Sequence, residues 1–428
     1  MMASMTPGVP QEISEVTLFW NEVFPKTDSG MEYMTVRDWD RPVQYFVGRN
    51  GSGKSRAAAA IGQKTGAHIL STDRLVGLMS FTTYGFGAVP TEYKGVPLSD
   101  NDRQQMKQLM GMKSAFIAPD ELYALREQPD IWLRVAAFLR RALGRVVELR
   151  ESAGFLDPYV LIKGSAYSLL RDEGHGLREL VLLLAGIYRH DWSFLVVDEP
   201  ELHLHPSMAR LWLTELNREC SSSERRAVVV THEPSLLKPT STEDLRAIWI
   251  FAAGAAPTRL YDSILKPQRD RVTSSLREHP ELVSKIVFSP RRVLVEGIHD
   301  VTALTVAMTR TQPSEVIAQT DLVECGGSGA VGLWFEICCR LSLDVKAIAD
   351  LDALFDSDVQ RAVDTLPEVT AAIRSDLAIE PASTAEALRQ LIQHADRQGV
   401  ASNPSSRAEW LASADFLELP GFRGADKS

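Results

Sequence analysis

The chain has 428 residues, which is more than one hydrophobic core usually supports, so its length predicts two domains. Apolar residues at 45% and charged residues at 24% are typical of a globular protein, and the net charge of −10 argues against a surface coated with nucleic-acid-binding basic residues. Local basic patches such as Arg134, Arg140, Arg141 and Arg145 remain compatible with that charge. The longest apolar run, Leu180 to Tyr188, is far shorter than a membrane span.

The N-terminal sequence and the cysteines both indicate the compartment in which the protein is located. The sequence MMASMTP has no basic stretch followed by an apolar segment, so no signal peptide is expected. Four cysteines show neither a disulfide framework nor zinc-ligand spacing. Cys338 and Cys339 are neighbours in an apolar stretch and are expected to be core or half-buried thiols. We therefore predict a reduced, cytoplasmic protein without a membrane segment.

Along the first part of the chain, strand and helix patterns alternate. Residues 43–47 predict a buried strand, and residues 55–66 predict a helix. The segment of about 71–130 has no clear period and is interpreted as an insertion. Apolar residues at helical spacing predict one amphipathic helix over about 131–152. The remaining expected elements are a helix at 177–188, a strand at 194–197, a helix beginning near 206, and strands at 227–230 and 247–251.

A domain border is expected near residue 285, because residues 252–283 are rich in proline, glycine and charge. Beyond it, short strands alternating with helices imply a small parallel sheet. The predicted elements are strands at 292–295, 322–325 and 345–349, and helices at 301–309 and 331–341. We expect an α/β protein with a larger domain over residues 1–285 and a smaller domain over residues 286–428.

A phosphate-binding loop is predicted where GRNGSGKS, residues 48–55, lies between a predicted strand and a predicted helix. The backbone N–H groups of such a loop and the helix N-terminus bind phosphate oxygens. Lys54 is expected to reach the β- and γ-phosphates of ATP, and Ser55 to ligate Mg²⁺. A glycine-rich turn with an incidental lysine is the alternative. The residues expected to cradle the nucleotide are Gly48, Asn50, Gly51 and Gly53.

Two carboxylates follow a later apolar strand, in the sequence FLVVDEPELHLHP. Asp198 is expected in the Mg²⁺ shell, and Glu199 as the catalytic base that polarises water. A strand ending in Thr-His, VVVTHEP, comes next. Together with the phosphate loop, these segments predict an ATP-hydrolysing site. His203 and His205 have the spacing of an H-x-H metal pair, which is the alternative for this stretch.

The sequence DEPExxLHP followed by a strand ending in Thr-His resembles the ABC-type ATPases that include the structural-maintenance-of-chromosomes (SMC) and overcoming-lysogenization-defect (OLD) proteins. The resemblance implies that His232 senses the γ-phosphate and that the loop of residues 201–205 faces a partner subunit. It therefore implies a homodimer, or a higher homo-oligomer, joined through the ATPase domain. It also implies that Gly176 of a signature loop binds the opposite ATP. Gly174 stands where the family has a serine, so one hydroxyl contact is lost.

Carboxylates also end two strands of the predicted second domain. The sequence RVLVEGIHD ends a strand on Glu296 and brings Asp300 one helical turn later, and VKAIADLD ends a strand on Asp350 and Asp352. The carboxyl ends of parallel strands converge, and four carboxylates in one crevice require a hard cation such as Mg²⁺ or Mn²⁺. In the alternative, Glu296 and Asp300 cap a helix and the D-x-D ends a strand in a turn.

Over about residues 286–355 this pattern, with the glycine pair of LVECGG between the two strands, resembles the Toprim domain of topoisomerases, primases and OLD-family nucleases. The resemblance implies that Glu296 and Asp300 hold one metal, and that Asp350 and Asp352 hold or share a second. It makes Glu296 and Asp350 the residues expected to support phosphodiester cleavage. The later acidic ligands of the family have no clear counterpart here; the only candidates are Glu409, Asp415 and Glu418.

An ABC-type ATPase followed by a Toprim domain is the architecture of OLD-family proteins. We interpret the chain as an ATP-regulated, metal-dependent endonuclease that acts on DNA or RNA in bacterial anti-phage defence. A partner protein or RNA of a defence system is compatible with this interpretation. The alternative is an ATP-switched sensor or scaffold of a defence complex, whose Toprim domain binds a partner and does not cut.

Overall fold

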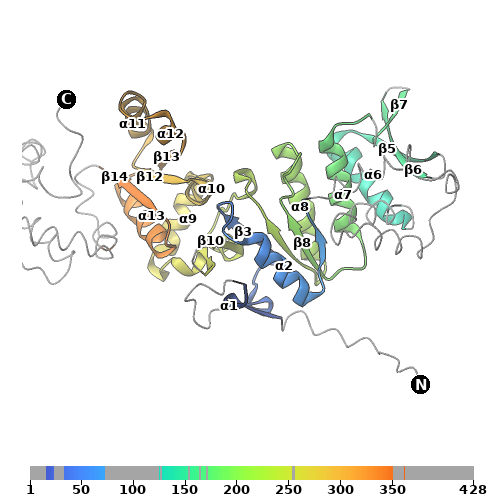
Figure 1. Ribbon diagram of the computed structural model, residues 1–428, viewed down its shortest axis with the longest axis horizontal. Coiled ribbons are helices and arrows are strands. Elements are labelled where there is room, and N and C mark those ends of the chain that lie inside the picture. The colour runs from blue at the N-terminus through green and yellow to red at the C-terminus, as the bar shows by residue number, and fades with distance from the viewer. Residues whose placement is uncertain are drawn as a thin grey trace, which may run out of the picture. The chain divides into compact units, whose positions relative to one another are not determined.

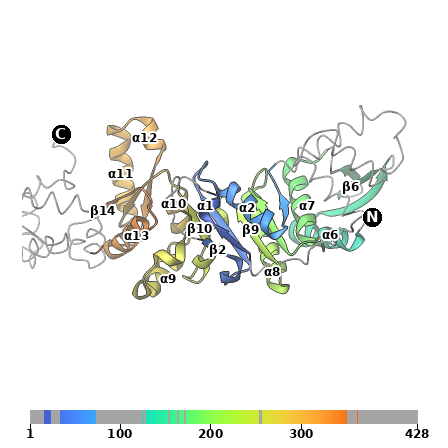
Figure 2. The same cartoon turned by 60° about the horizontal axis from the view of Figure 1, so that its bottom comes forward.

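The computed structural model describes residues 16–23, 33–72, 125, 128–152, 155–162, 165–169, 172–252, 256–349 and 361. The chain divides into two compact units, shown in Figures 1 and 2. The first comprises the residues up to Leu237 together with Arg246–Arg259, and the second comprises Lys238–Leu245 together with the residues from Leu260 onward. The predicted border near residue 285 stays a prediction. Most of the predicted insertion lies outside the described residues.

The first unit is built on a six-stranded sheet with the order β11-β10-β3-β9-β8-β4 (Figure 1). Its strands pair in parallel except β11, which is antiparallel to β10. The first four residues of β8 and the last four of β9 are buried, as expected for parallel strands covered on both faces. The strands are β3 (Val43–Gly48), β4 (His68–Leu70), β8 (Phe194–Asp198), β9 (Arg226–Val230), β10 (Ile248–Phe251) and β11 (Thr258–Arg259).

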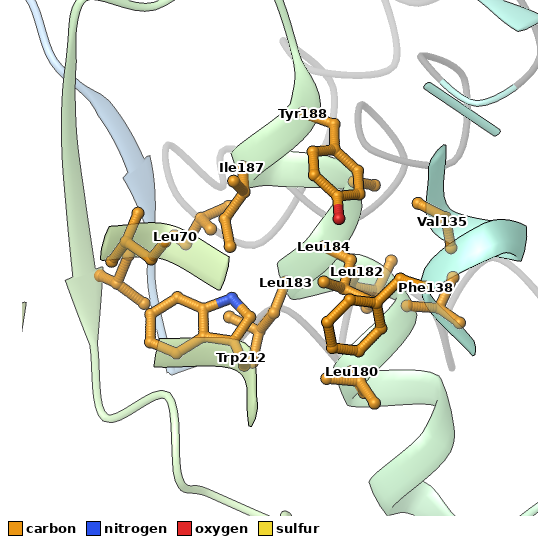
Figure 3. Packing of buried hydrophobic residues seen from close by; sticks show 14 of the residues in the cluster. Leu70, Val135, Phe138, Leu180, Leu182, Leu183, Leu184, Ile187, Tyr188 and Trp212 are labelled. Carbon is orange, nitrogen blue, oxygen red and sulfur yellow. The ribbon is translucent and has the colours of Figure 1, made fainter. Parts of the chain in front are cut away.

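Alternate residues of these strands point into two different cores. Leu195 and Val197 of β8 belong to a cluster formed with α6, α7 and α8, part of which is shown in Figure 3. Phe194 and Val196 belong to a second cluster, formed with α2 and the N-terminal elements. Burial on both faces makes this a layered α/β unit. The other elements are β1 (Thr17–Phe19), α1 (Trp20–Val23), β2 (Tyr33–Thr35), α2 (Lys54–Thr65), α6 (Pro129–Leu143), α7 (His175–Tyr188) and α8 (Pro206–Ser222).

The helix predicted over residues 131–152 is wrong in its second half. Helix α6 ends at Leu143, because Gly144 follows with a φ of 65° and its N–H closes the last turn on Arg140. The chain then enters β5 (Val146–Ser152), which forms an antiparallel sheet with β6 (Phe155–Ile162) and β7 (Ser165–Ser168). The β-branched pair Val146-Val147 matches the helical spacing by chance, and both residues pair with β6 instead.

The second unit contains the predicted small parallel sheet. Its order is β13-β12-β14, with β12 (Arg291–Val295) at the centre, and both neighbours pair with β12 in parallel. Trp334 donates its indole N–H to Ser275 Oγ at 2.9 Å, which ties α13 to α9. The other elements are α9 (Arg269–Glu278), α10 (Leu282–Phe288), α11 (Ile298–Thr311), α12 (Ser314–Ala318), β13 (Thr320–Glu324), α13 (Ser328–Arg340) and β14 (Val345–Ile348).

Short 3-10 helices complete the described secondary structure: η2 (Val36–Asp38), η4 (Pro234–Leu236), η5 (Asp244–Ala247), η6 (Leu260–Ser263) and η7 (Lys266–Gln268). Within the described ranges, no helix combines the length and the apolar character that crossing a bilayer requires. Cys338 is buried and Cys339 is half-buried, as predicted from their apolar surroundings.

Candidate functional site

The phosphate loop begins at a position that only glycine can occupy. Gly48, at the end of β3, has a φ of 146°, and a Cβ added there would lie 2.2 Å from the carbonyl oxygen of Phe251 in β10. The loop ends at Gly53, which precedes α2 with a φ of 96°. The predicted sequence of strand, glycine-rich loop and helix is therefore present, with Asn50 and Gly51 in the exposed part of the loop.

Lys54 is buried and bends back over this loop. Its Nζ donates to the carbonyl oxygens of Gly48 at 3.0 Å and of Arg49 at 2.9 Å. Burial lowers the pKa of Lys54 to about 8, although the carboxylates of Glu199, Asp198 and Glu201 oppose that shift. The side chain thus places a cation beside the loop and within the electrostatic reach of three acids.

Ser55 and Asp198 come together from distant parts of the sequence. The Ser55 hydroxyl donates to Asp198 Oδ1 at 3.2 Å. Ser55 is at the start of the helix after β3, and Asp198 ends β8, which is separated from β3 in the sheet by β9. Both side chains offer the oxygen donors that Mg²⁺ prefers, so this pair fits the predicted metal of the ATP site.

Glu199 and His232 lie at the ends of adjacent strands. Glu199 Oε1 is 3.4 Å from His232 Nε2. The backbone N–H of Glu199, which has a φ of 47°, donates to the carbonyl oxygen of Val230 at 2.9 Å, so the turn after β8 is attached to the end of β9. The pKa of His232 is lowered by burial and by the positive charge of Lys54, against the opposing charge of Asp198. At neutral pH this imidazole is therefore uncharged.

Sequence reasoning did not foresee the position of the Glu201 side chain. Its Oε1 accepts the Thr231 hydroxyl at 2.8 Å and the backbone N–H of His232 at 2.7 Å. The resemblance placed this residue only in a loop that faces a partner. An acidic residue two positions after Asp-Glu, together with a hydroxyl residue directly before the histidine, was the available signal.

The signature loop and the loop of residues 201–205 are neighbours within one protomer. A Cβ on Gly176 would lie 3.0 Å from the carbonyl oxygen of His203, and the rings of His175 and His203 are 5.5 Å apart. Gly174 begins α7 without a side-chain cap, and its N–H donates to Glu173 Oε1 at 3.2 Å. The two loops therefore lie side by side at Gly176 and His203.

His205 does not act with His203 in the way that the H-x-H alternative requires. His205 Nδ1 accepts the backbone N–H of Ser207 at 3.3 Å and lies 2.8 Å from the Ser207 hydroxyl. This side chain caps helix α8. Capping explains the second histidine without a metal.

The basic residues of α6 are partly used inside the protein. Arg134 pairs with Glu219 and stacks over the ring of Tyr188 at 4.0 Å. Arg141 lies 3.8 Å from Glu215. Two of the arginines in the suggested basic patch thus contribute to contacts between α6, α7 and α8.

In the second unit, Glu296 follows the central strand β12. Its carbonyl oxygen accepts the N–H groups of Gly326 at 2.9 Å and Gly327 at 2.8 Å, which brings the predicted glycine pair to the end of β12. Asp300 Oδ2 accepts the N–H of Gly297 at 2.9 Å at the start of α11. Asp300 therefore has the capping contact that the alternative reading required.

The other predicted ligands of this site, Asp350 and Asp352, lie outside the described residues, as do Glu409, Asp415 and Glu418. In the part of the chain that the structure describes, no group of three or more His, Cys, Asp or Glu side chains could hold a metal ion. Glu296 and Asp300 alone do not make a two-metal site.

A comparison with protein families matches residues 162–238 to the family described as "AAA domain, putative AbiEii toxin, Type IV TA system". The matched segment contains α7, β8 and β9, with Asp198, Glu199 and His232. The first unit thus contains an AAA-type ATPase domain. A search of curated proteins found no match.

Among solved structures, the chain is similar to an Smc head bound to the C-winged helix domain of ScpA, with 14% identity and a TM-score of 0.28 over 49% of this chain. It spans 62% of that head's length. The Pyrococcus furiosus Smc head bound to the C-terminal domain of ScpA gives 12% identity and a TM-score of 0.27, covering 52% of this chain and 69% of that one. Stu0660 of Streptococcus thermophilus gives 10% identity and a TM-score of 0.29, covering 58% of this chain and 87% of that one. Scores this low carry no inference about fold or function.

Proposed function

We propose that this chain is a cytoplasmic endonuclease of bacterial anti-phage defence, and that ATP hydrolysis in its first unit governs metal-dependent cutting of nucleic acid by its second unit. One observation carries the ATPase part: Ser55, Asp198, Glu199 and His232 meet at the carboxyl ends of the neighbouring strands β3, β8 and β9. The match to an AAA domain supports it.

In the proposed reaction, Lys54 and the loop N–H groups bind the β- and γ-phosphates, and Glu199 accepts a proton from the attacking water. The neutral state of His232 matters here, because an uncharged imidazole leaves the negative charge of Glu199 available as a base. Ser55 and Asp198 would hold Mg²⁺, which neutralises phosphate charge when it is bound.

The experiment that tests this part compares Glu199→Gln with wild type. The carboxamide keeps the size of the side chain but cannot accept the proton, so we expect ATP to bind with unchanged affinity and kcat to fall about 100-fold or more. Lys54→Ala should instead abolish ATP binding, because it removes the cation beside the phosphates. The assay is phosphate release together with binding of a fluorescent ATP analogue. Equal ATPase rates in wild type and Glu199→Gln would exclude Glu199 as the base.

The nuclease part rests on the second unit. Glu296 stands at the carboxyl end of the central strand of a parallel sheet, beside the Gly326-Gly327 turn of β13. Strand β14, on the other side of β12, leads along the sequence towards Asp350 and Asp352. The carboxyl edge of an open parallel sheet is where such proteins place their sites. This arrangement supports the Toprim interpretation and the order of domains found in OLD proteins.

A second candidate function is the ATP-switched scaffold whose second unit does not cut. The contact between Asp300 Oδ2 and the Gly297 N–H favours it, because that contact assigns Asp300 a structural role. Under this proposal the carboxylates of the second unit have no metal, and the ATPase is the working part.

Three variants, Asp300→Asn, Glu296→Ala and Asp350→Ala, distinguish the nuclease from the scaffold. The side-chain oxygen of asparagine can still accept the N–H of Gly297, but asparagine is a poor ligand for a hard cation. For a nuclease, we expect each variant to reduce cleavage by about 100-fold or more, with ATP binding and thermal stability unchanged for Asp300→Asn. The assay incubates plasmid DNA or tRNA with Mg²⁺ or Mn²⁺, with and without ATP. Biological activity in cells that survives Glu296→Ala and Asp350→Ala together favours the scaffold.

We also propose that the chain forms a homodimer, or a multiple of it, through the first unit. The exposed side chains of His175 and His203 lie side by side where the signature loop meets the loop of residues 201–205. In the family that the sequence resembles, the signature loop caps the ATP of the opposite subunit, and the loop of residues 201–205 faces that subunit.

A further inference from the structure

The carboxylate of Glu201 connects two loops of the ATP site. Glu201 belongs to the turn after β8, where the N–H of Leu204 donates to its carbonyl oxygen at 2.9 Å. Its side chain crosses to the end of β9 and accepts from Thr231 and His232 through a single oxygen, Oε1. The bond from the His232 N–H holds the backbone at the point where that residue leaves the strand.

Thr231 extends the connection by one more bond. Its side chain is fully buried, its N–H donates to Phe46 in β3 at 3.2 Å, and its hydroxyl oxygen accepts the N–H of Glu233 at 3.0 Å. Because the carboxylate of Glu201 can only accept, the Thr231 hydroxyl donates its proton to it. A hydrogen-bonded chain therefore runs from Glu233 through Thr231 to Glu201, and it encloses the backbone of His232.

The second oxygen of Glu201 has an unusual environment. Oε2 is buried and has no hydrogen-bond partner in the described part of the structure. Burial raises the pKa of Glu201, the bonds from His232 and Thr231 oppose the shift, and the negative charge of Glu199 adds to it. Burying a carboxyl oxygen without a hydrogen-bond partner costs free energy of folding. That cost suggests that the carboxyl group has a role at this position.

We propose that Glu201 is a positioning residue, which holds the Thr231-His232 turn so that the imidazole of His232 faces Glu199 and the γ-phosphate. The inference rests on the proposed ATP hydrolysis. It assigns to Glu201 a role inside its own protomer, in addition to the place of its loop beside a partner. Glu199 Oε1 is 3.4 Å from His232 Nε2. The contact between these two side chains therefore depends on how Glu201 positions His232.

The test compares Glu201→Ala with Glu201→Gln. Glutamine keeps an oxygen that accepts from Thr231 and His232, whereas alanine removes both bonds. Since misplacing a reacting group by about 1 Å can cost a factor of about 100, we expect Glu201→Ala to lower kcat about 10- to 100-fold and Glu201→Gln to stay within about 3-fold of wild type. KM for ATP should change less than about 3-fold in both variants, because neither bond contacts the nucleotide.

A matched control is Glu233→Ala, which removes a carboxylate from the same loop. Glu233 Oε1 accepts the N–H of Ser235 at 2.9 Å and caps η4, whereas its bond to Thr231 is made by the backbone N–H, which alanine keeps, so kcat should remain close to that of wild type. If Glu201→Ala does not fold, the pair Thr231→Val and Thr231→Ser gives the same comparison, because serine keeps the hydroxyl that donates to Glu201.

Three results would overturn the inference. In the first, Glu201→Ala has wild-type kcat. In the second, Glu201→Gln is as inactive as Glu201→Ala, which would mean that the charge itself, rather than the hydrogen bonds, is needed. In the third, wild type does not hydrolyse ATP, and that result overturns the proposed ATPase as well, so the two failures are distinguishable.

Discussion

At the scale of single residues, Gly48 determines how closely two strands approach at the ATP site. Its backbone lies against the carbonyl of Phe251, and no side chain fits between them. The same φ value that places it beside β10 also turns the chain into the phosphate loop. One residue therefore carries a steric and a conformational requirement together.

Gly48→Ala is expected to lower the free energy of unfolding by roughly 3 kcal/mol or more, because a Cβ both clashes with Phe251 and strains the backbone. Gly66→Ala is the matched control. Gly66 has a φ of 64° but nothing within 4 Å of an added Cβ, so we expect a loss of only about 1 kcal/mol. Denaturant unfolding without nucleotide measures both. Equal losses would show that the approach to Phe251 is not limiting.

The residues of the ATP site were predictable to the extent that their signals are local. The phosphate loop, the Asp-Glu after a strand and the Thr-His at the end of another are short patterns, and the structure brings their side chains together. The contact of Glu201 with His232 joins residues 31 positions apart, and spacing does not predict such a contact. For Asp300 the local pattern was ambiguous, because a carboxylate at the start of a helix can be either a metal ligand or a helix cap.

At the scale of elements, the helices of the first unit are joined by a polar cluster. Glu215 of α8 accepts from the Tyr188 hydroxyl of α7 and from Arg218 Nε at 3.1 Å, and it lies 3.8 Å from Arg141 of α6. The apolar patterns of these helices were sufficient to predict α7 and the start of α8. The end of α6 was not predictable in the same way, because Val146 and Val147 suit a helix and a strand equally well until β6 is present.

The acid stability of the first unit should depend on Glu215. Burial raises the pKa of Glu215. The hydrogen bonds from Arg218 and Tyr188 and the charges of Arg218 and Arg141 lower it by more, so the net shift is downward from 4.5. Its stabilising effect is therefore complete above pH 4.5 and is lost as the pH falls through the lowered pKa. Glu215→Gln should cost about 2 kcal/mol at pH 7, and this difference from wild type should shrink below pH 4.5.

The control for that prediction is Glu148→Gln, whose carboxylate is about half exposed and pairs with Arg150 at 3.5 Å. An exposed pair contributes less than about 1 kcal/mol, so this variant should unfold nearly as wild type does at every pH. Chemical unfolding at pH 3, 4, 5 and 7 measures this, provided that the free energy of unfolding is determined to within about 0.5 kcal/mol. A pH-independent loss in Glu215→Gln would mean that packing, and not charge, is responsible.

At the scale of the whole molecule, the proposed dimer predicts that assembly depends on ATP and on His203. Glu199→Gln with ATP should sediment as a dimer at micromolar protein, because ATP remains bound between the protomers. Adding His203→Glu should shift it towards monomer by placing a negative charge where the loops meet. Glu224→Lys, just beyond the C-terminal end of α8, is the control and should leave the dimer intact. A monomer of Glu199→Gln with ATP contradicts the proposed assembly.

The order in which a ribosome releases this chain has a consequence for when the protein can first bind nucleotide. The phosphate loop is synthesised early, but β3 acquires its two sheet neighbours only when β9 and β10 have emerged, much later. Moreover, Arg246–Arg259 belong to the first unit but follow a segment of the second. A nascent chain that stops at Leu237 lacks β10, the strand whose Phe251 contacts Gly48. Translation must therefore pass beyond the first stretch of the second unit, Lys238–Leu245, before the ATP site can be completed.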